Sequence, residues 1–124
     1  MQLLFKTEDF VNIDLASKEE KRIIERIRNG ETVVINMQLH KIAKKFAEEK
    51  GVYVRVDRYS KFGNPFHMKT ESQRSEVCDK YKEWVVSKPD KIQQIKKMKG
   101  KVFGCHCHPK QCHADFMKYI ADND

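Results

Sequence analysis

Short β-branched runs alternate with stretches of helical periodicity, and this alternation restricts the fold more than any other feature of the chain. Strand-like runs lie at residues 2–5, 32–36, 52–56 and 101–103. Apolar residues at helical spacing predict helices at residues 17–28, 39–50, 73–86, 89–99 and 114–121. Strands joined through helices pair in parallel by right-handed crossovers. The pattern therefore predicts one three-layer α/β domain with a small, mostly parallel sheet of about four strands.

A capping box marks the start of the first of these helices. Ser17 is followed three residues later by Glu20, the spacing at which the two residues satisfy each other's backbone N–H groups. The apolar stripe that follows is expected to end before Gly30.

The size and charge of the chain limit its possible partners. Its 124 residues suit a single domain, residues 1–124, that buries a core without disulfide bridges. The formal net charge of +7 favours nucleic acid or nucleotides as partners, although a basic surface can also serve solubility alone. The lysines of residues 91–101 form either a nucleic-acid contact or a solvated face. No apolar run approaches the ~20 residues of a membrane span and no cleavable signal is visible, so we expect no membrane partner and a cytoplasmic location.

Residues 104–113 concentrate the side chains that bind metals and anions. Three of the four cysteines and three of the five histidines lie in this stretch, between a predicted strand and a predicted helix. The first turn of a helix lowers thiol pKa values and attracts anions. Without a secretory signal, free thiols or metal ligands are expected rather than disulfides. A zinc site would use Cys105, Cys107, Cys112 and His113, with Cys78 or His67 as a further ligand.

A second unusual segment is the predicted loop at residues 57–70. Loops this long inside a small domain are more often functional than not. Gly63-Asn64-Pro65 fixes a sharp turn within it. The alternative is structural: Phe62 and Phe66 fill the core while Asn64 bonds its own backbone.

Both segments follow predicted strands, and ligands of open α/β sheets bind beyond the carboxyl ends of the strands. We therefore expect one pocket between them. Its expected ligand-binding residues are Arg58, Ser60, Lys61, Asn64 and Arg74. In that pocket the arginines would bind phosphate and Asn64 a base or sugar. The catalytic candidates are His113 as acid–base and Cys105 or Cys112 as nucleophile.

Two separated motifs and the helix between them also match a known family. The residues that carry the match are Arg58, Ser60-Lys61-Phe62-Gly63-Asn64-Pro65-Phe66, Arg74, Tyr81, Trp84 and Gly104-Cys105-x-Cys107-x-Pro109-x-x-Cys112-His113. With these motifs the chain resembles the domain-of-unknown-function family 4326, small proteins of bacteria and bacteriophages. The resemblance covers residues 52–124, whereas residues 1–51 match poorly. It implies a Rossmann-like α/β fold and residence in a bacterial or phage-infected host cytoplasm, but no established activity.

Three hypotheses for the function follow. In the first, the protein binds a nucleotide or nucleic-acid-derived ligand between the two motifs; a variant of this hypothesis is that it also processes the ligand. The second is a non-catalytic, zinc-stabilised module that binds nucleic acid or a host protein. The third is that the Cys/His turn only closes the domain. The sequence leaves open whether the protein is an enzyme.

Overall fold

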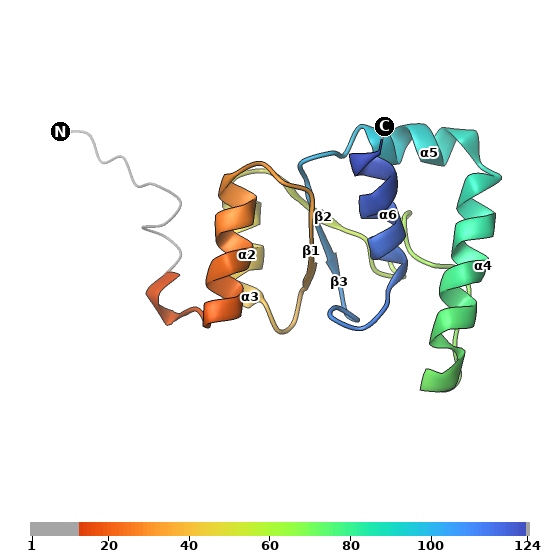
Figure 1. Cartoon of the computed structure of the whole chain (residues 1–124), viewed down its shortest axis with the longest axis horizontal. Helices are drawn as coiled ribbons and strands as arrows, with labels where there is room; N and C mark the ends of the chain where they lie inside the picture. The colour runs from red at the N-terminus through yellow and green to blue at the C-terminus, as the bar shows by residue number, and fades with distance from the viewer. Residues whose placement is uncertain (1–12, 124) are drawn as a thin grey trace.

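The fold is a three-layer α/β arrangement around a small parallel sheet (Figure 1). The structure is a computed structural model and describes residues 13–123. Helices α2 and α3 cover one face of the sheet, and α4, α5 and α6 cover the other. The predicted fold class is thereby confirmed. The strand expected at residues 2–5 lies outside the described residues.

The bounds of the elements agree with the predicted ones to within a few residues. The strands are β1 (Val33–Asn36), β2 (Tyr53–Arg55) and β3 (Val102–Cys105). The α-helices are α2 (Lys18–Arg28), α3 (Lys41–Glu49), α4 (Arg74–Val86), α5 (Pro89–Lys96) and α6 (His113–Asp122). Two 3-10 turns, η1 (Ile13–Leu15) and η2 (Glu71–Gln73), complete the described elements. Within residues 13–123, no helix combines the length and the apolar character needed to cross a membrane.

The sheet contains three strands among the described residues, in the order β1-β3-β2 and all parallel. The strand that comes last in the sequence is therefore the central one. Val33 of β1 pairs with Val102 of β3, and Tyr53 of β2 pairs with the same residue from the other side. The unit formed by β1, α3 and β2 is thus split, because β3 inserts between its two strands.

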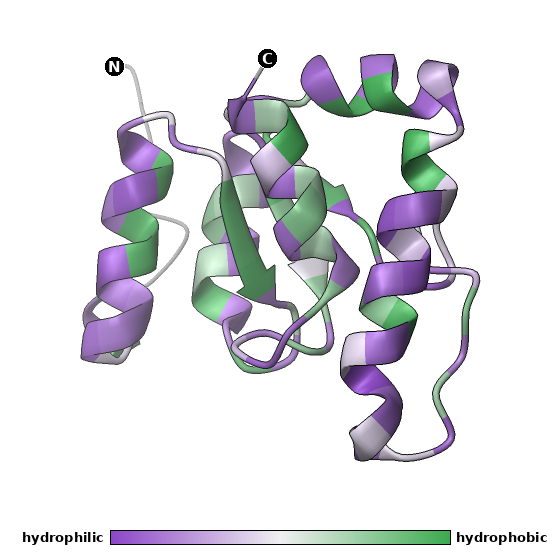
Figure 2. Ribbon diagram, turned by 45° about the vertical axis from the view of Figure 1, so that its right-hand side comes forward, coloured by the Kyte–Doolittle hydropathy of each residue, from purple (hydrophilic) through white to green (hydrophobic). Residues whose placement is uncertain are grey.

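Alternation along the strands divides the core between the two faces. Val33 and Ile35 of β1 pack with α2 and α3, whereas Val34 packs with α4, α5 and α6. This is the two-residue period of extended backbone. Each helix buries one apolar stripe, and Figure 2 shows hydrophobic strands at the centre and hydrophilic residues along the helices.

The predicted capping box is only half formed. The side chain of Ser17 accepts a hydrogen bond from Glu20 N at 3.1 Å, as expected. Glu20 does not close the box, because its buried carboxylate accepts a bond from Ala43 N in the first turn of α3 at 2.6 Å. A carboxylate is favourable at a helix N-terminus, so Glu20 ties α2 to the start of α3.

Candidate functional site

The carboxyl ends of the three strands meet at one edge of the sheet, and both sequence motifs lie there. Residues 57–70 leave β2 at this edge, and residues 106–112 connect β3 to α6. A cavity of about 370 Å³ lies between them, and both Asn64 and Cys112 contribute to its wall. We call it the edge cavity. Its lining residues are Asp57, Arg58, Tyr59, Asn64, Phe66, Met68, Arg74, Val77, Cys78, Cys105, His106, Cys107, Gln111, Cys112 and His113.

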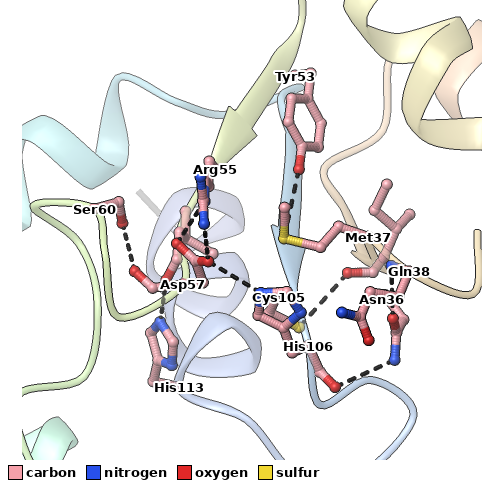
Figure 3. A network of polar contacts seen from close by, with 12 residues as sticks. Asn36, Met37, Gln38, Tyr53, Arg55, Asp57, Ser60, Cys105, His106 and His113 are labelled. Carbon is pink, nitrogen blue, oxygen red and sulfur yellow. Dashed lines mark hydrogen bonds and ion pairs between the residues drawn. The ribbon is translucent and has the colours of Figure 1, made fainter. Parts of the chain in front are cut away.

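A buried carboxylate lies at the centre of the polar network on this edge (Figure 3). The side chain of Asp57 is only 3% exposed and accepts two hydrogen bonds from Arg55, at 2.8 and 2.7 Å. Its Oδ2 also lies 3.0 Å from Nε2 of His106. Burial raises the pKa of Asp57, but the hydrogen bonds from Arg55 and His106 outweigh it, and the net pKa is lowered. Asp57 is therefore an ionised carboxylate at neutral pH.

The loop after β2 is folded tightly against its own beginning. A Cβ on Gly63 would lie 2.5 Å from the carbonyl oxygen of Asp57 and from Cα of Arg58, so the approach needs glycine. Ser60 donates to the carbonyl oxygen of Asp57 at 2.8 Å. Ser60 and Lys61, two of the expected ligand-binding residues, do not belong to the wall of the edge cavity.

Asn64 holds this loop against helix α4. Its amide nitrogen donates to the carbonyl oxygen of Val77 at 3.1 Å, and its amide oxygen accepts from Phe66 N at 2.9 Å. The second bond is the backbone bond that the structural interpretation expected. Phe62 is buried in the core, also as that interpretation expected, but Phe66 is half-buried and lines the edge cavity.

Arg74 links helix α4 to the Cys/His turn. Its guanidinium donates to both carboxylate oxygens of Glu71 at 2.8 Å, and to the carbonyl oxygen of Gln111 at 3.0 Å. The hydrogen bonds with Glu71 raise the pKa of Arg74 and lower the pKa of Glu71 to about 2. Arg58 lies on the cavity wall and is exposed.

The three thiols of the turn interact with one another. Hydrogen bonding from Cys112 and the guanidinium of Arg74 outweigh the effect of burial and together lower the pKa of Cys107 to about 5. The same partner lowers the pKa of Cys105. The interactions with Cys105 and Cys107, together with burial, raise the pKa of Cys112. Cys107 is half-buried whereas the other two are buried, so the geometry favours Cys107 as the accessible thiolate.

His113 faces the backbone of β2 rather than open space. Its Nε2 lies 2.6 Å from the carbonyl oxygen of Val56, and its Nδ1 lies 3.5 Å from Sγ of Cys112. A carbonyl only accepts, so Nε2 donates, and burial lowers the pKa of the ring. His113 is therefore neutral, and its unprotonated Nδ1 faces the thiol of Cys112.

The expected zinc ligands Cys105, Cys107 and Cys112 lie close together and interact with one another. Across residues 13–123, no three His, Cys, Asp or Glu side chains are grouped so that they could hold a metal ion. His113 is bonded to Val56 and Cys112, and Sγ of Cys105 lies 3.5 Å from the carbonyl oxygen of Ile35. Cys78, the suggested further ligand, is buried and also lines the edge cavity.

Asn36, at the end of β1, holds the Cys/His turn in place and was not singled out by its sequence pattern. Its amide nitrogen donates to the carbonyl oxygens of His106 and His108, at 3.3 and 2.9 Å. Its amide oxygen accepts from the backbone of Gln38 at 2.9 Å and of Leu39 at 3.1 Å. Asn36 therefore joins the turn after β1 to the turn after β3.

Sequence reasoning also missed the group formed by Asp57, Arg55 and His106. A signal was present, because Asn36 is the polar last residue of the buried strand β1 and Asp57 follows the end of β2 by two residues. At such positions polar side chains reach the ligand edge of an open α/β sheet.

The fold and the edge cavity define the class as a small α/β domain with an open parallel sheet. The chain belongs to the family described as Domain of unknown function (DUF4326), whose model matches residues 37–123. The family match thus begins earlier than residue 52, where the sequence motifs placed it, and includes α3. Neither the curated proteins nor the solved structures contain a match to this chain.

Proposed function

We propose that the protein binds a nucleotide or a nucleic-acid-derived ligand in the edge cavity. One observation carries this proposal: residues of both motifs, far apart in sequence, line one cavity at the carboxyl edge of a parallel sheet. Such edges are where open α/β sheets bind their ligands. A volume of about 370 Å³ lies within the range of roughly 300–1,000 Å³ that small-molecule sites occupy.

The chemistry of the wall supports a ligand with an aromatic base and an anionic group. Tyr59 is 81% exposed and Phe66 half-buried, and both offer aromatic faces on which a base can stack. Arg58 is an exposed guanidinium on the same wall, suited to phosphate. His106 is exposed on the same wall; its Nε2 is engaged by Asp57, which leaves Nδ1 for a hydrogen bond to a sugar or a base edge.

Arg74 has a different role in this proposal from the one its sequence position predicts. All three nitrogens of its guanidinium already donate hydrogen bonds: Nε and Nη2 to Glu71, and Nη1 to the carbonyl oxygen of Gln111. It therefore positions the Cys/His turn, and Arg58 is the residue that binds phosphate.

Isothermal titration calorimetry with the four ribonucleoside monophosphates and the matching nucleosides tests the proposal. We expect Arg58→Ala to weaken nucleotide binding about tenfold or more while leaving nucleoside binding nearly unchanged. Tyr59→Ala should weaken both. Arg22→Ala, an exposed arginine on α2, is the matched control. The proposal fails if no nucleotide or nucleoside binds, or if Arg58→Ala and Arg22→Ala bind nucleotides equally well.

A second function, suggested by the proximity of Cys105, Cys107 and Cys112, is zinc binding without catalysis. It requires these side chains to move, because the described residues are not grouped for a metal ion as they stand. Native mass spectrometry of the purified protein tests it. A zinc adduct that disappears on chelation and in Cys107→Ser, but persists in Cys78→Ser, would support it. A protein that stays metal-free after incubation with zinc would refute it.

A further inference from the structure

A second cavity lies beside the first, on the other side of the Cys/His turn. It has a volume of about 340 Å³ and is lined by residues of α4, of α6 and of the end of the turn. We call it the helix cavity. Its lining residues are Cys78, Lys82, Gln111, Cys112, His113, Asp115, Phe116 and Tyr119. Four of these, Cys78, Gln111, Cys112 and His113, also line the edge cavity, so the two cavities share a wall.

The helix cavity carries an aromatic platform. The rings of Phe116 and Tyr119 are stacked, with centroids 6.2 Å apart and planes inclined by 10°. Tyr119 is 62% exposed, which is unusual for a large aromatic residue on a helix that buries its other face. The exposed ring of Tyr119, stacked on the half-buried ring of Phe116, is a surface on which a planar group can stack.

The lysines at this surface are paired with carboxylates. Nζ of Lys82 lies 5.8 Å from the ring centroid of Phe116, and its ion pair with Asp79 is long, at 3.9 Å. Lys118 lies on the same helix as the platform and pairs with Asp122. The one carboxylate of the wall, Asp115, is engaged through Oδ2 by Cys112 N at 3.1 Å. The net charge of +7 of the whole chain therefore provides the electrostatic argument, and it favours an anionic ligand such as a phosphate backbone over a cationic or neutral apolar one.

We infer that the ligand is a single-stranded nucleic acid, which places one base in the edge cavity and a neighbouring base on the Phe116 and Tyr119 platform of the helix cavity. The inference rests on the proposed function and specifies its substrate class. The shared wall favours an oligonucleotide over a single nucleotide, because two cavities, each large enough for a base, adjoin at the same four residues. The phosphodiester between the bases would cross near Gln111, which is exposed.

The test compares ligands of increasing length on the full chain at one fixed salt concentration. A ribonucleoside monophosphate, a dinucleotide and a tetranucleotide are titrated by calorimetry, in both RNA and DNA form. Base stacking on an aromatic side chain contributes roughly a 5- to 150-fold gain in affinity. We expect a gain of that order from the mononucleotide to the dinucleotide.

Variants of the platform separate stacking from general charge attraction. Tyr119→Ala and Phe116→Leu should remove most of the gain in affinity on lengthening while leaving mononucleotide binding unchanged. Phe116→Leu keeps the apolar packing of a residue that contacts the core, and Tyr119 is exposed, so neither variant should unfold the protein. Lys82→Ala should weaken dinucleotide binding more than Lys80→Ala, a lysine on the same helix that pairs with Glu76.

The outcomes distinguish this inference from the proposed function. Absence of mononucleotide binding overturns both. Mononucleotide binding with no gain on lengthening overturns only the inference. The same holds for a gain that persists in Tyr119→Ala and Phe116→Leu, because that gain would come from charge alone. A gain present only with RNA or only with DNA supports the inference and names the kind of strand.

Discussion

The two faces of the sheet are built from different kinds of side chain. On the face covered by α2 and α3, here called the scaffold face, every buried residue of the described hydrophobic cluster is Ala, Val, Ile or Phe, and the carboxylate of Glu20 is buried beside it. On the face covered by α4, α5 and α6, here called the site face, the core includes Tyr81, Cys105, Cys112 and Met117. The scaffold face buries aliphatic side chains and Phe46, whereas the site face also buries thiols and rings beside a cavity.

The largest effect that separates the faces should come from two phenylalanines. Phe46 is 1% exposed on the scaffold face, and Phe46→Ala should lower the free energy of unfolding by about 3–5 kcal/mol. Phe66 is half-buried on the edge cavity, so Phe66→Ala should cost only about 1 kcal/mol but weaken nucleotide binding. Urea unfolding and calorimetry measure the two quantities. Equal losses of unfolding free energy in Phe46→Ala and Phe66→Ala would contradict the difference proposed between the scaffold face and the site face.

The next effect concerns the buried carboxylate. Asp57→Asn should lower the free energy of unfolding by about 1.5–3 kcal/mol at pH 7, because it weakens charge-assisted bonds to Arg55 and His106. The folded pKa of Asp57 is lowered from 3.8, so the stabilisation is complete above that value and is lost as the pH falls through the lower folded pKa. Urea unfolding from pH 7 to pH 3 should show the stability curves of the wild type and of the Asp57→Asn variant converging at the acidic end. A difference that stays constant over this range would show that the carboxylate charge does not stabilise the fold.

A pair of glycines sharpens the comparison between a structural turn and the site. Gly63→Ala forces the backbone at Asp57 and Arg58 to move, and such overpacking costs about 1–3 kcal/mol. Gly51→Ala meets no atom within 4 Å but has a φ of +73°, which costs about 1–2 kcal/mol. We expect similar losses of stability, with nucleotide affinity reduced only in Gly63→Ala. Calorimetry on both variants decides this, and unchanged binding in Gly63→Ala would argue against a role for the loop in the cavity.

The smallest effect is expected at the rim. Nζ of Lys110 lies 3.6 Å from Oε1 of Glu71, and both side chains are mostly exposed. Exposed ion pairs contribute little, so Lys110→Ala should change the free energy of unfolding by less than about 0.5–1 kcal/mol. A larger loss in urea unfolding would mean that the rim stabilises the Cys/His turn beyond the contacts of Arg74.

Periodicity and turn residues were enough to predict nearly all described elements, because these signals are local. The positions of the Gly-Asn-Pro-Phe loop and the Cys/His turn at one edge followed from the general geometry of parallel sheets. The strand order did not follow, because the insertion of β3 between β1 and β2 depends on pairing across many residues.

The details of the candidate site were less predictable than its location. Asp57 read as the first residue of a loop; its partner Arg55 is two residues away, but His106 comes from the turn after β3. His113 read as a catalytic candidate because its sequence position did not reveal the carbonyl of Val56 beside it. The position of Asn36 at the end of β1 was a signal for the edge of the sheet, but its partners His106 and His108 come from a distant segment and could not be predicted from local sequence.

The central position of β3 also has a consequence for how the protein is made. β2 ends at Arg55 and β3 begins at Val102, so a ribosome adds the residues between them over roughly 2–9 s. During that interval β1 and β2 leave the exit tunnel with no strand to pair with, because both bond only to β3 within the described sheet. The sheet and the Cys/His turn are therefore completed together, and a nascent chain that stalls before Val102 has neither.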